Sequence, residues 1–230
     1  AGALAHHFNT LMTIVAGNLE LAHENTAPGS ETDQLLTHAL SGCKRAADLG
    51  HTLLLYTGQF AEALASLDLS AFCHQQLDSI KPAIRQILTV DLAEPGPKIL
   101  ADPNHLARVL ASLLTNAMET IDKEPGQSTL RVRYLDPESL SSAHIFPTGW
   151  NPAAGRYGCL EVIDNGAGID EAQMINIFDP FYSEKFLGRG LGLPLALGIV
   201  KKLHGAITVV SQVHQGTTFR VLLPEQADTA

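Results

Sequence analysis

The N-terminal residues 1–60 carry apolar side chains at helical spacing. In residues 4–22 these positions recur every three or four residues, at Leu4, Phe8, Leu11, Val15, Leu19 and Ala22, which predicts an amphipathic helix. Pro28 and Gly29 interrupt the pattern before a second helix that is expected to run to about residue 59. Two helices alone leave an apolar stripe exposed, so this helical hairpin is expected to dimerise into a four-helix bundle.

Beyond residue 60 the pattern changes to mixed strands and helices. A linker is expected over residues 61–68, a domain over 69–225 and a short tail over 226–230. The elements predicted in that domain are helices at 70–84, 105–121 and 193–205 with one short helix after residue 170, strands at 87–93, 98–102, 129–135 and 159–164, and a hairpin at 206–223. The Pro, Gly and Ser-bearing residues 136–157 are assigned no element. The fold class is therefore α+β, a helical hairpin followed by an α/β sandwich.

Composition narrows the class of protein. A chain of 230 residues with 45% hydrophobic and 17% charged residues is a folded soluble protein. Its formal net charge of −9 argues against nucleic acid as a partner. The apolar runs are too short for a membrane-spanning helix, and the cysteines, Cys43, Cys73 and Cys159, form no CxxC pair. We expect a cytoplasmic location, no membrane contact by this part of the protein, and neither zinc nor disulfides.

Two helical side chains are candidates for chemistry. Helical geometry places His6 away from the apolar stripe, with Thr10 one turn later beside it. An exposed histidine is commonly idle, however. Asn116, on the helix predicted at 105–121, offers a neutral oxygen suited to Mg²⁺, although a helical Asn is commonly a plain surface residue.

Two Gly-rich segments are candidates for binding an anion. In DNGAGID, residues 164–170, Asp164 ends an apolar strand, and Gly166 and Gly168 let the backbone approach a ligand; the pattern also occurs as an ordinary turn. GRGLGLP, residues 188–194, opens a helix with Pro194 in its first turn, which favours a phosphate, although such helix starts also occur without a ligand. The order Asn, DxGxG, FDPF and GxGLGL favours the functional interpretation.

Taken together, these motifs resemble the catalytic portion of sensor histidine kinases, a dimerisation and phosphoacceptor hairpin followed by a GHKL-type ATP-binding domain. LAHHFNTLMTIVAGNLELA resembles the H-box, HLARVLASLLTNAMET the N-box, VIDNGAGID the G1 box, IFDPFYSEKF the F-box, and GRGLGLPLALGIVKKLHGAI with GTTFRVLLP the G2 box and closing hairpin. The resemblance covers nearly the whole chain, and it implies ATP and Mg²⁺ as cofactors.

The resemblance also implies a role for each matching residue. His6 would be the phosphoacceptor, Asn116 the Mg²⁺ ligand, and Asp164 the acceptor of a hydrogen bond from the adenine amino group. The other positions would shape the nucleotide pocket and its lid: Gly166, Gly168, Gly188, Gly190, Leu191, Gly192 and Leu193 around the nucleotide, Phe178 and Phe181 as anchors of the lid, and Lys185 and Arg189 as its cations. Such a set suits phosphoryl transfer, which depends on positioning and charge neutralisation.

Two positions depart from the family's pattern. His7 stands where the family usually carries Asp or Glu, and an imidazole is a less effective partner for orienting and deprotonating the phosphoacceptor. Ser112 replaces a common first Asn of the N-box. Slow autophosphorylation is therefore expected. His7 is an alternative acceptor, disfavoured because its helical face is expected to be the more buried.

The resulting hypothesis is a homodimeric histidine kinase core that phosphorylates His6 and passes the phosphoryl group to an aspartate of a response-regulator receiver domain. Because the chain begins inside a predicted helix, a sensor domain is expected upstream. Three alternatives stay open. A degenerate kinase acting as a nucleotide-binding dimeric scaffold is favoured by His7. A phosphotransfer protein without ATP is opposed by the glycines, and a chaperone, gyrase or repair type of GHKL ATPase by the H-box hairpin.

Overall fold

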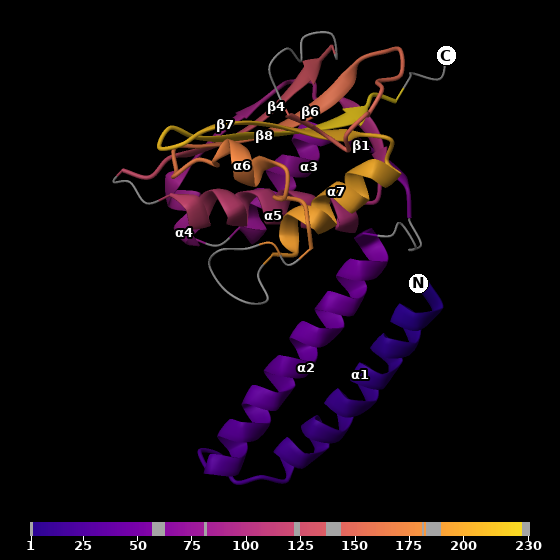
Figure 1. Cartoon of the computed structure of the whole chain (residues 1–230), viewed down its shortest axis with the longest axis vertical. Helices are drawn as coiled ribbons and strands as arrows, with labels where there is room; N and C mark the ends of the chain where they lie inside the picture. Colours follow the sequence, from indigo (N-terminus) through magenta and orange to yellow (C-terminus); the bar gives the residue numbers. More distant parts are fainter. Residues whose placement is uncertain are drawn as a thin grey trace. The chain divides into compact units, whose positions relative to one another are not determined.

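The chain divides into two compact units, residues 1–60 and 61–230 (Figure 1). The computed structural model describes residues 2–56, 63–80, 82–121, 125–136, 144–180, 182 and 190–226. Within these ranges, no helix is both long enough and apolar enough to cross a lipid bilayer.

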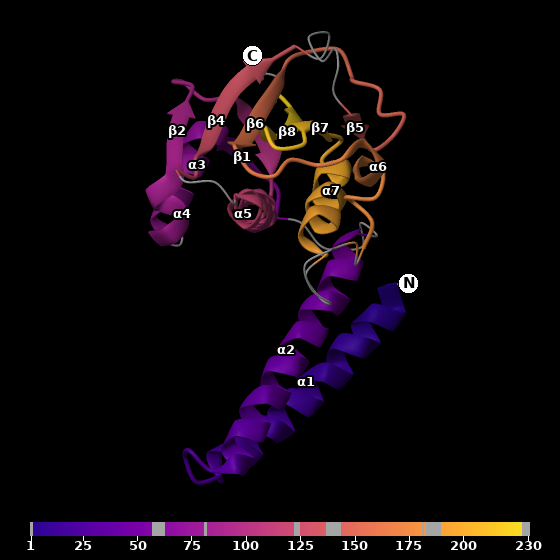
Figure 2. The same ribbon diagram turned by 60° about the vertical axis from the view of Figure 1, so that its left-hand side comes forward.

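Unit 1 is a pair of antiparallel helices, α1 (Gly2–Glu24) and α2 (Glu31–Tyr56), which lie side by side in both views (Figures 1 and 2). Asp33, in the first turn of α2, stabilises the turn that connects the two helices. Its carboxylate pairs with Nε2 of His23 on α1 at 2.8 Å and accepts a hydrogen bond from the Gly29 amide at 2.8 Å. The last residues of the second predicted helix, after Tyr56, lie outside the described residues.

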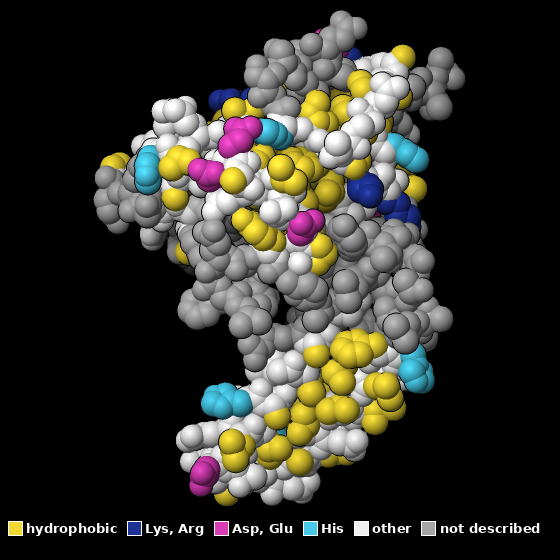
Figure 3. Space-filling model, viewed as in Figure 1, with side chains coloured by type: hydrophobic (Ala, Val, Ile, Leu, Met, Phe, Trp, Pro, Cys, Tyr) yellow, Lys and Arg dark blue, Asp and Glu magenta, His cyan; other side chains and the backbone are white. Residues whose placement is uncertain are grey.

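Apolar side chains remain exposed along the hairpin of the single chain (Figure 3). On α1, 37–57% of the surface of Phe8, Leu11, Ile14 and Val15 is accessible. A two-helix unit has too little interior to cover such a stripe. Dimerisation into a four-helix bundle stays a prediction.

Unit 2 is built on a six-stranded sheet with the strand order β2-β4-β6-β8-β7-β5. The strands, in that order, are Leu88–Leu92, Ser128–Leu135, Tyr157–Asp164, Gly216–Pro224, Ala206–Gln212 and His144–Phe146. β2 and β4 are parallel, and all the other neighbours are antiparallel. A separate antiparallel pair is formed by β1 (Ala65–Asp68) and β3 (Lys98–Ala101).

The helices of unit 2 gather on one face of the six-stranded sheet, which Figure 2 shows nearly edge-on. They are α3 (Leu69–Gln76), the 3-10 turn η1 (Leu77–Ser79), α4 (Pro82–Ile87), α5 (Pro103–Thr120), α6 (Glu171–Met174) and α7 (Gly192–Lys202). The largest wholly buried side chains include Leu110 and Leu113 of α5, Leu160 of β6 and Ile199 of α7. The main core therefore lies between α5, α7 and the sheet.

The opposite face of the sheet holds a buried carboxylate. Glu161 of β6 is 1% exposed and pairs with Arg131 at 3.1 Å, Arg133 at 3.1 Å and Arg220 at 2.6 Å. Arg131 and Arg220 are its direct cross-strand neighbours. Three guanidinium groups compensate the loss of hydration that would otherwise make this burial costly.

The structure of unit 2 differs from the sequence-based expectations at four places. The single helix expected at 70–84 is split, because Pro82 lacks an amide hydrogen and begins the new helix α4. The linker expected at 61–68 contains β1. This strand pairs with β3, and short-range sequence patterns do not reveal such a pairing. Residues 136–157 contain β5, and Gln226, expected in the tail, donates its amide hydrogen to the Lys98 carbonyl at 2.8 Å.

Candidate functional site

The helix that carries most of the site, α5, starts at a buried cap. The Asp102 carboxylate accepts hydrogen bonds from the amides of Asn104 at 2.8 Å, His105 at 3.3 Å and Ala63 at 2.9 Å. The bond from Ala63 is the main cause that holds the pKa of Asp102 below its ordinary value. These bonds fix the start of α5 and hence the direction of its side chains.

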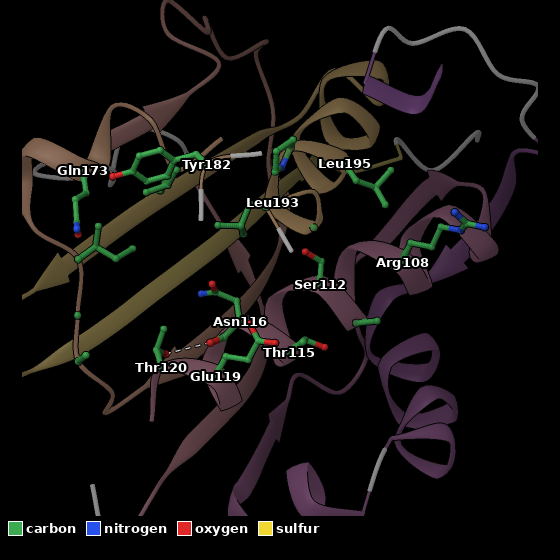
Figure 4. Close-up of a pocket in the computed structure, with 18 residues that line it drawn as sticks. Arg108, Ser112, Thr115, Asn116, Glu119, Thr120, Gln173, Tyr182, Leu193 and Leu195 are labelled. Carbon is green, nitrogen blue, oxygen red and sulfur yellow. Dashed lines mark hydrogen bonds between the residues drawn. The ribbon is translucent and has the colours of Figure 1, made fainter. Parts of the chain in front are cut away.

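A cavity of about 700 Å³ lies along α5 and is closed by the segment after β6, the segment from α6 to Tyr182 and the start of α7 (Figure 4). That volume suits a nucleotide-sized ligand. The face of α5 contributes residues from successive turns: Arg108, Ala111, Ser112, Thr115, Asn116, Glu119 and Thr120. The other walls contribute Ala167, Gly168, Ile169, Gln173, Ile177, Tyr182, Gly190, Gly192, Leu193, Pro194 and Leu195.

A buried carboxylate that does not itself line the cavity lies close to Thr120, which does. Asp164, the last residue of β6, is 4% exposed, and its Oδ1 accepts a hydrogen bond from the Gly166 amide at 2.8 Å. Its Oδ2 is buried and has no hydrogen-bond partner among the described residues. Burial raises the pKa of Asp164. A buried acceptor left without a donor is costly unless a ligand supplies one.

The glycines of the DNGAGID segment serve the packing of the chain itself. A Cβ on Gly166 would lie 2.5 Å from the Thr120 carbonyl oxygen, and one on Gly168, whose φ is +74°, would lie 2.1 Å from the Gln212 carbonyl oxygen. Both glycines were expected to admit a ligand to the backbone. The structure shows that both admit neighbouring backbone, and of the two only Gly168 lines the cavity, so approach of a ligand to them stays a prediction.

The far part of the cavity joins α5 to the first turn of α7. The N-cap residue of α7, Leu191, makes no side-chain capping hydrogen bond, and a first turn without such a cap leaves amide donors that favour an anion. Ser112 of α5 faces this turn, since a Cβ on Gly192 would come within 2.7 Å of its Oγ. The Ser112 hydroxyl is buried and also lacks a hydrogen-bond partner among the described residues.

The charges along the cavity are unevenly placed. Among the described lining residues only Arg108 and Glu119 are charged. Eleven positions along α5 separate them, about 16 Å at the helical rise. Figure 4 shows Arg108 apart from Glu119, which lies beside Asn116 and Thr120. The cation is thus at the Ser112 side, where an anion is favoured, and the carboxylate is near the Asp164 end.

The structure brings together part of the expected site. Asn116, Gly168, Gly190, Gly192 and Leu193 line the cavity, whereas Asp164 and Gly166 lie behind its surface. Leu191 is the residue before α7, and Phe178 is buried at 4% exposure. The lid residues Phe181, Lys185, Gly188 and Arg189 lie outside the described residues.

The phosphoacceptor candidates are on α1. His6 belongs to that helix, but its side chain is outside the described part of the structure. The side chains of His7 and Thr10 are exposed. His7 was expected on a more buried face. Because the side chain of His6 lies outside the described part of the structure, the comparison of the two faces stays a prediction.

Sequence reasoning missed several lining residues. Arg108, Glu119 and Thr120 follow from helical periodicity, since they lie on the same face of α5 as Ser112 and Asn116. Gln173 and Tyr182 carry no comparable signal. They reach the cavity only because the chain between β6 and α7 folds back over α5.

Comparison with known families addresses what such a cavity binds. Residues 101–227, from the last residue of β3 to just beyond β8, match the family model described as "Histidine kinase-, DNA gyrase B-, and HSP90-like ATPase". The chain belongs to this ATPase family. Because this is a family of ATPases, the match indicates ATP as the ligand of the cavity along α5.

Three curated relatives narrow the assignment. Over 97% of this chain, the sensor kinase CckA of Brucella abortus is 29% identical and the sensor histidine kinase ZraS of Escherichia coli is 29% identical. The histidine kinase/phosphatase NtrB of Rhizobium meliloti is 33% identical over 66% of it. The chain spans 24%, 44% and 40% of the length of these relatives. Each of these relatives is a sensor or histidine kinase, and this chain is similar to part of each.

Solved structures agree on the fold. ShkA in complex with AMPPNP superposes with a TM-score of 0.72 at 22% identity, covering 99% of this chain and 46% of ShkA. The histidine kinase AdeS of Acinetobacter baumannii superposes with a TM-score of 0.59 at 17% identity, covering 94% of this chain and 96% of AdeS. Unit 2 therefore has the GHKL-type α/β fold.

Proposed function

We propose that unit 2 binds ATP with Mg²⁺ in the cavity along α5, and that the chain transfers the γ-phosphoryl group to His6. From His6 the group would pass to an aspartate of a response-regulator receiver domain in two-component signalling. The observation that carries the nucleotide proposal is the buried Oδ2 of Asp164, which has no hydrogen-bond partner among the described residues. The adenine amino group is a donor of the kind this oxygen lacks.

The residues of the cavity fit the two ends of a nucleotide. Asp164 would accept the hydrogen bond from the base, and Asn116 would hold Mg²⁺ through its side-chain oxygen. Mg²⁺, when bound, supplies positive charge beside the phosphate oxygens. The phosphates would lie at the end of the cavity far from Asp164. There the Ser112 hydroxyl and the amides of the first turn of α7 would donate hydrogen bonds to them, and Arg108 would supply a positive charge.

The transfer step needs a neutral imidazole at His6. Its unprotonated ring nitrogen would bond to the γ-phosphorus while the bond to the bridging oxygen of ADP breaks. The proton on the other ring nitrogen then leaves to water or to His7, which stands where the family carries an acid. A second imidazole is a poorer acceptor of that proton, so the transfer is expected to be slow.

His7, which stands where the family usually carries an acid, favours one second function, a degenerate kinase that binds nucleotide as a dimeric scaffold without useful autophosphorylation. Both functions require the cavity to bind nucleotide. They differ only in whether phosphate reaches His6, so labelling of that residue separates them.

Calorimetric titration of the chain with a non-hydrolysable ATP analogue tests the shared claim. Binding is expected to require Mg²⁺ and to be strongly weakened by Asp164→Ala or Asn116→Ala. Asn165→Ala is the matched control, because Asn165 belongs to the same Gly-rich segment but its side chain bonds to residues 125 and 127. Absence of binding by the unmodified chain, or equal loss in the Asn165 variant, would contradict the proposal.

A further inference from the structure

Strand β5 extends the sheet beyond β7, and no motif of the family covers it. It pairs antiparallel with β7, with Phe146 opposite Ile207 and Ile145 opposite Thr208. Figure 2 shows β5 directly beside α6. The segment that contains this strand, residues 136–157, is the part of unit 2 whose purpose the sequence leaves open.

The side chains of β5 alternate between two different environments. Ile145 packs against the small core on the outer face of the sheet, which contains Tyr157 and Leu222. Phe146 points to the other side, where its ring centroid lies 4.5 Å from that of Phe178 with an interplanar angle of 51°. Both this distance and the tilt are typical of a favourable aromatic pair.

A second contact joins β5 to the same neighbour. His144, two residues before Phe146 and therefore on the same side of the strand, has Nε2 3.7 Å from Oε1 of Glu171 in α6. Both side chains are exposed, so this contact contributes little by itself. It shows, however, that β5 meets the chain from Glu171 to Phe178 at both ends.

That stretch of chain, residues 171–180, forms one wall of the cavity; we call it the wall segment. Gln173 and Ile177 of the wall segment line the cavity, and Tyr182 follows directly. Phe178 is the neighbour of Ile177 and is 4% exposed. Phe178 is therefore held by Phe146 on one side while the adjacent Ile177 faces the cavity.

We propose that Phe146 is a positioning residue for the nucleotide cavity, acting through Phe178 to hold the wall segment in place. The link to affinity rests on nucleotide binding by the cavity. If the wall is out of place in a fraction of the molecules, the apparent dissociation constant rises by the inverse of the competent fraction. Loss of an aromatic pair shifts such an opening equilibrium by about twofold to tenfold.

The full chain carrying Phe146→Ala tests this proposal, with Ile145→Ala as the matched control. The two residues are neighbours on one strand but pack on opposite faces of the sheet. Amide hydrogen exchange of residues 171–180 is measured without nucleotide, and the dissociation constant of a non-hydrolysable ATP analogue is measured with Mg²⁺. Both are measured at a temperature at which circular dichroism shows each variant folded.

Phe146→Ala is expected to accelerate exchange in the wall segment about twofold to tenfold and to raise the apparent dissociation constant by at most that factor, because affinity falls only with the competent fraction. Ile145→Ala is expected to lower the melting temperature while leaving both quantities near those of the parent. Equal effects of the two substitutions, or no effect of Phe146→Ala, would overturn the proposal. If Phe146→Ala fails to fold, Phe146→Leu takes its place, because leucine keeps the apolar bulk. Faster exchange in the wall segment and weaker binding are expected for it too.

The two measurements, hydrogen exchange and nucleotide affinity, separate this inference from the proposed function. If the parent chain binds no nucleotide, the proposed function fails, and the exchange measurement still decides whether Phe146 positions the wall segment. If nucleotide binds but exchange in residues 171–180 is indifferent to Phe146, the positioning role alone is overturned.

Discussion

The Oγ of Ser112 occupies the space that a side chain on Gly192 would need: a Cβ there would come within 2.7 Å of that oxygen. The next nearest atom, the Ser112 Cβ, would be 3.6 Å away, which is ordinary contact. The hydroxyl is thus the atom that a side chain at residue 192 would meet first. Both residues line the cavity, so this contact lies at its proposed phosphate end.

Gly192→Ala is therefore expected to lower the free energy of unfolding by about 1–3 kcal/mol through overpacking. In a Ser112→Ala background the clash is absent, so the same substitution should cost much less. Urea denaturation of the parent, the two single variants and the double variant measures this coupling. Additive effects would show that the two residues do not oppose each other.

Asp164→Asn is expected to change stability and binding in opposite directions. Burial raises the pKa of Asp164 above its usual 3.8, so the folded protein binds more protons than the unfolded chain just above that pH. Stability contributed by this group therefore falls as the pH rises above that value, and the ionised carboxylate keeps a desolvation penalty in the folded protein. Removing the charge should raise the melting temperature of the nucleotide-free protein.

The same substitution should weaken nucleotide binding about tenfold or more, because a hydrogen bond to a charged acceptor is lost. Thermal unfolding at pH 7, with and without nucleotide, compares the two effects. A lower melting temperature without nucleotide would contradict the assignment of Asp164 as a buried acceptor kept for a ligand.

The site shows why prediction from sequence reached only part of the structure. Asn116 and the Gly-rich segments could be found because their chemistry and spacing are local. β5 could not, because three residues beside a Pro carry too little pattern and are stabilised by pairing with β7, distant in the chain. The close packing of Gly166 against the Thr120 carbonyl could not be predicted for the same reason, since Thr120 is brought to it only by the fold.

The exposed stripe on α1 predicts that the chain is a dimer. Leu11→Glu should shift it toward monomer, because burial of each large apolar side chain contributes about 1.5–3 kcal/mol. Leu100→Glu in unit 2 is the matched control, since Leu11 and Leu100 are 47% and 48% exposed. Light scattering at micromolar concentration distinguishes the two. A monomeric parent, or equal dissociation by both variants, would contradict the prediction.

Removal of divalent cations provides a further test of the charge arrangement in the cavity. Asn116 offers a neutral oxygen, so binding of the analogue should fall when EDTA is added and return with Mg²⁺ in excess. Arg108→Gln should weaken binding under both conditions, because it removes a cation proposed to face the phosphates directly. If neither EDTA nor Arg108→Gln changes the affinity for the analogue, this orientation of the nucleotide is excluded.

The measurement that most directly tests the central claim is the mapping of acid-labile phosphate after incubation with γ-labelled ATP and Mg²⁺. Slow labelling confined to His6 is predicted, with complete loss in His6→Gln and preserved or faster labelling in His7→Asp, where a carboxylate accepts the proton. Label on His7 that survives loss of His6, or an unlabelled parent and His7→Asp variant that both bind nucleotide, would contradict the claim.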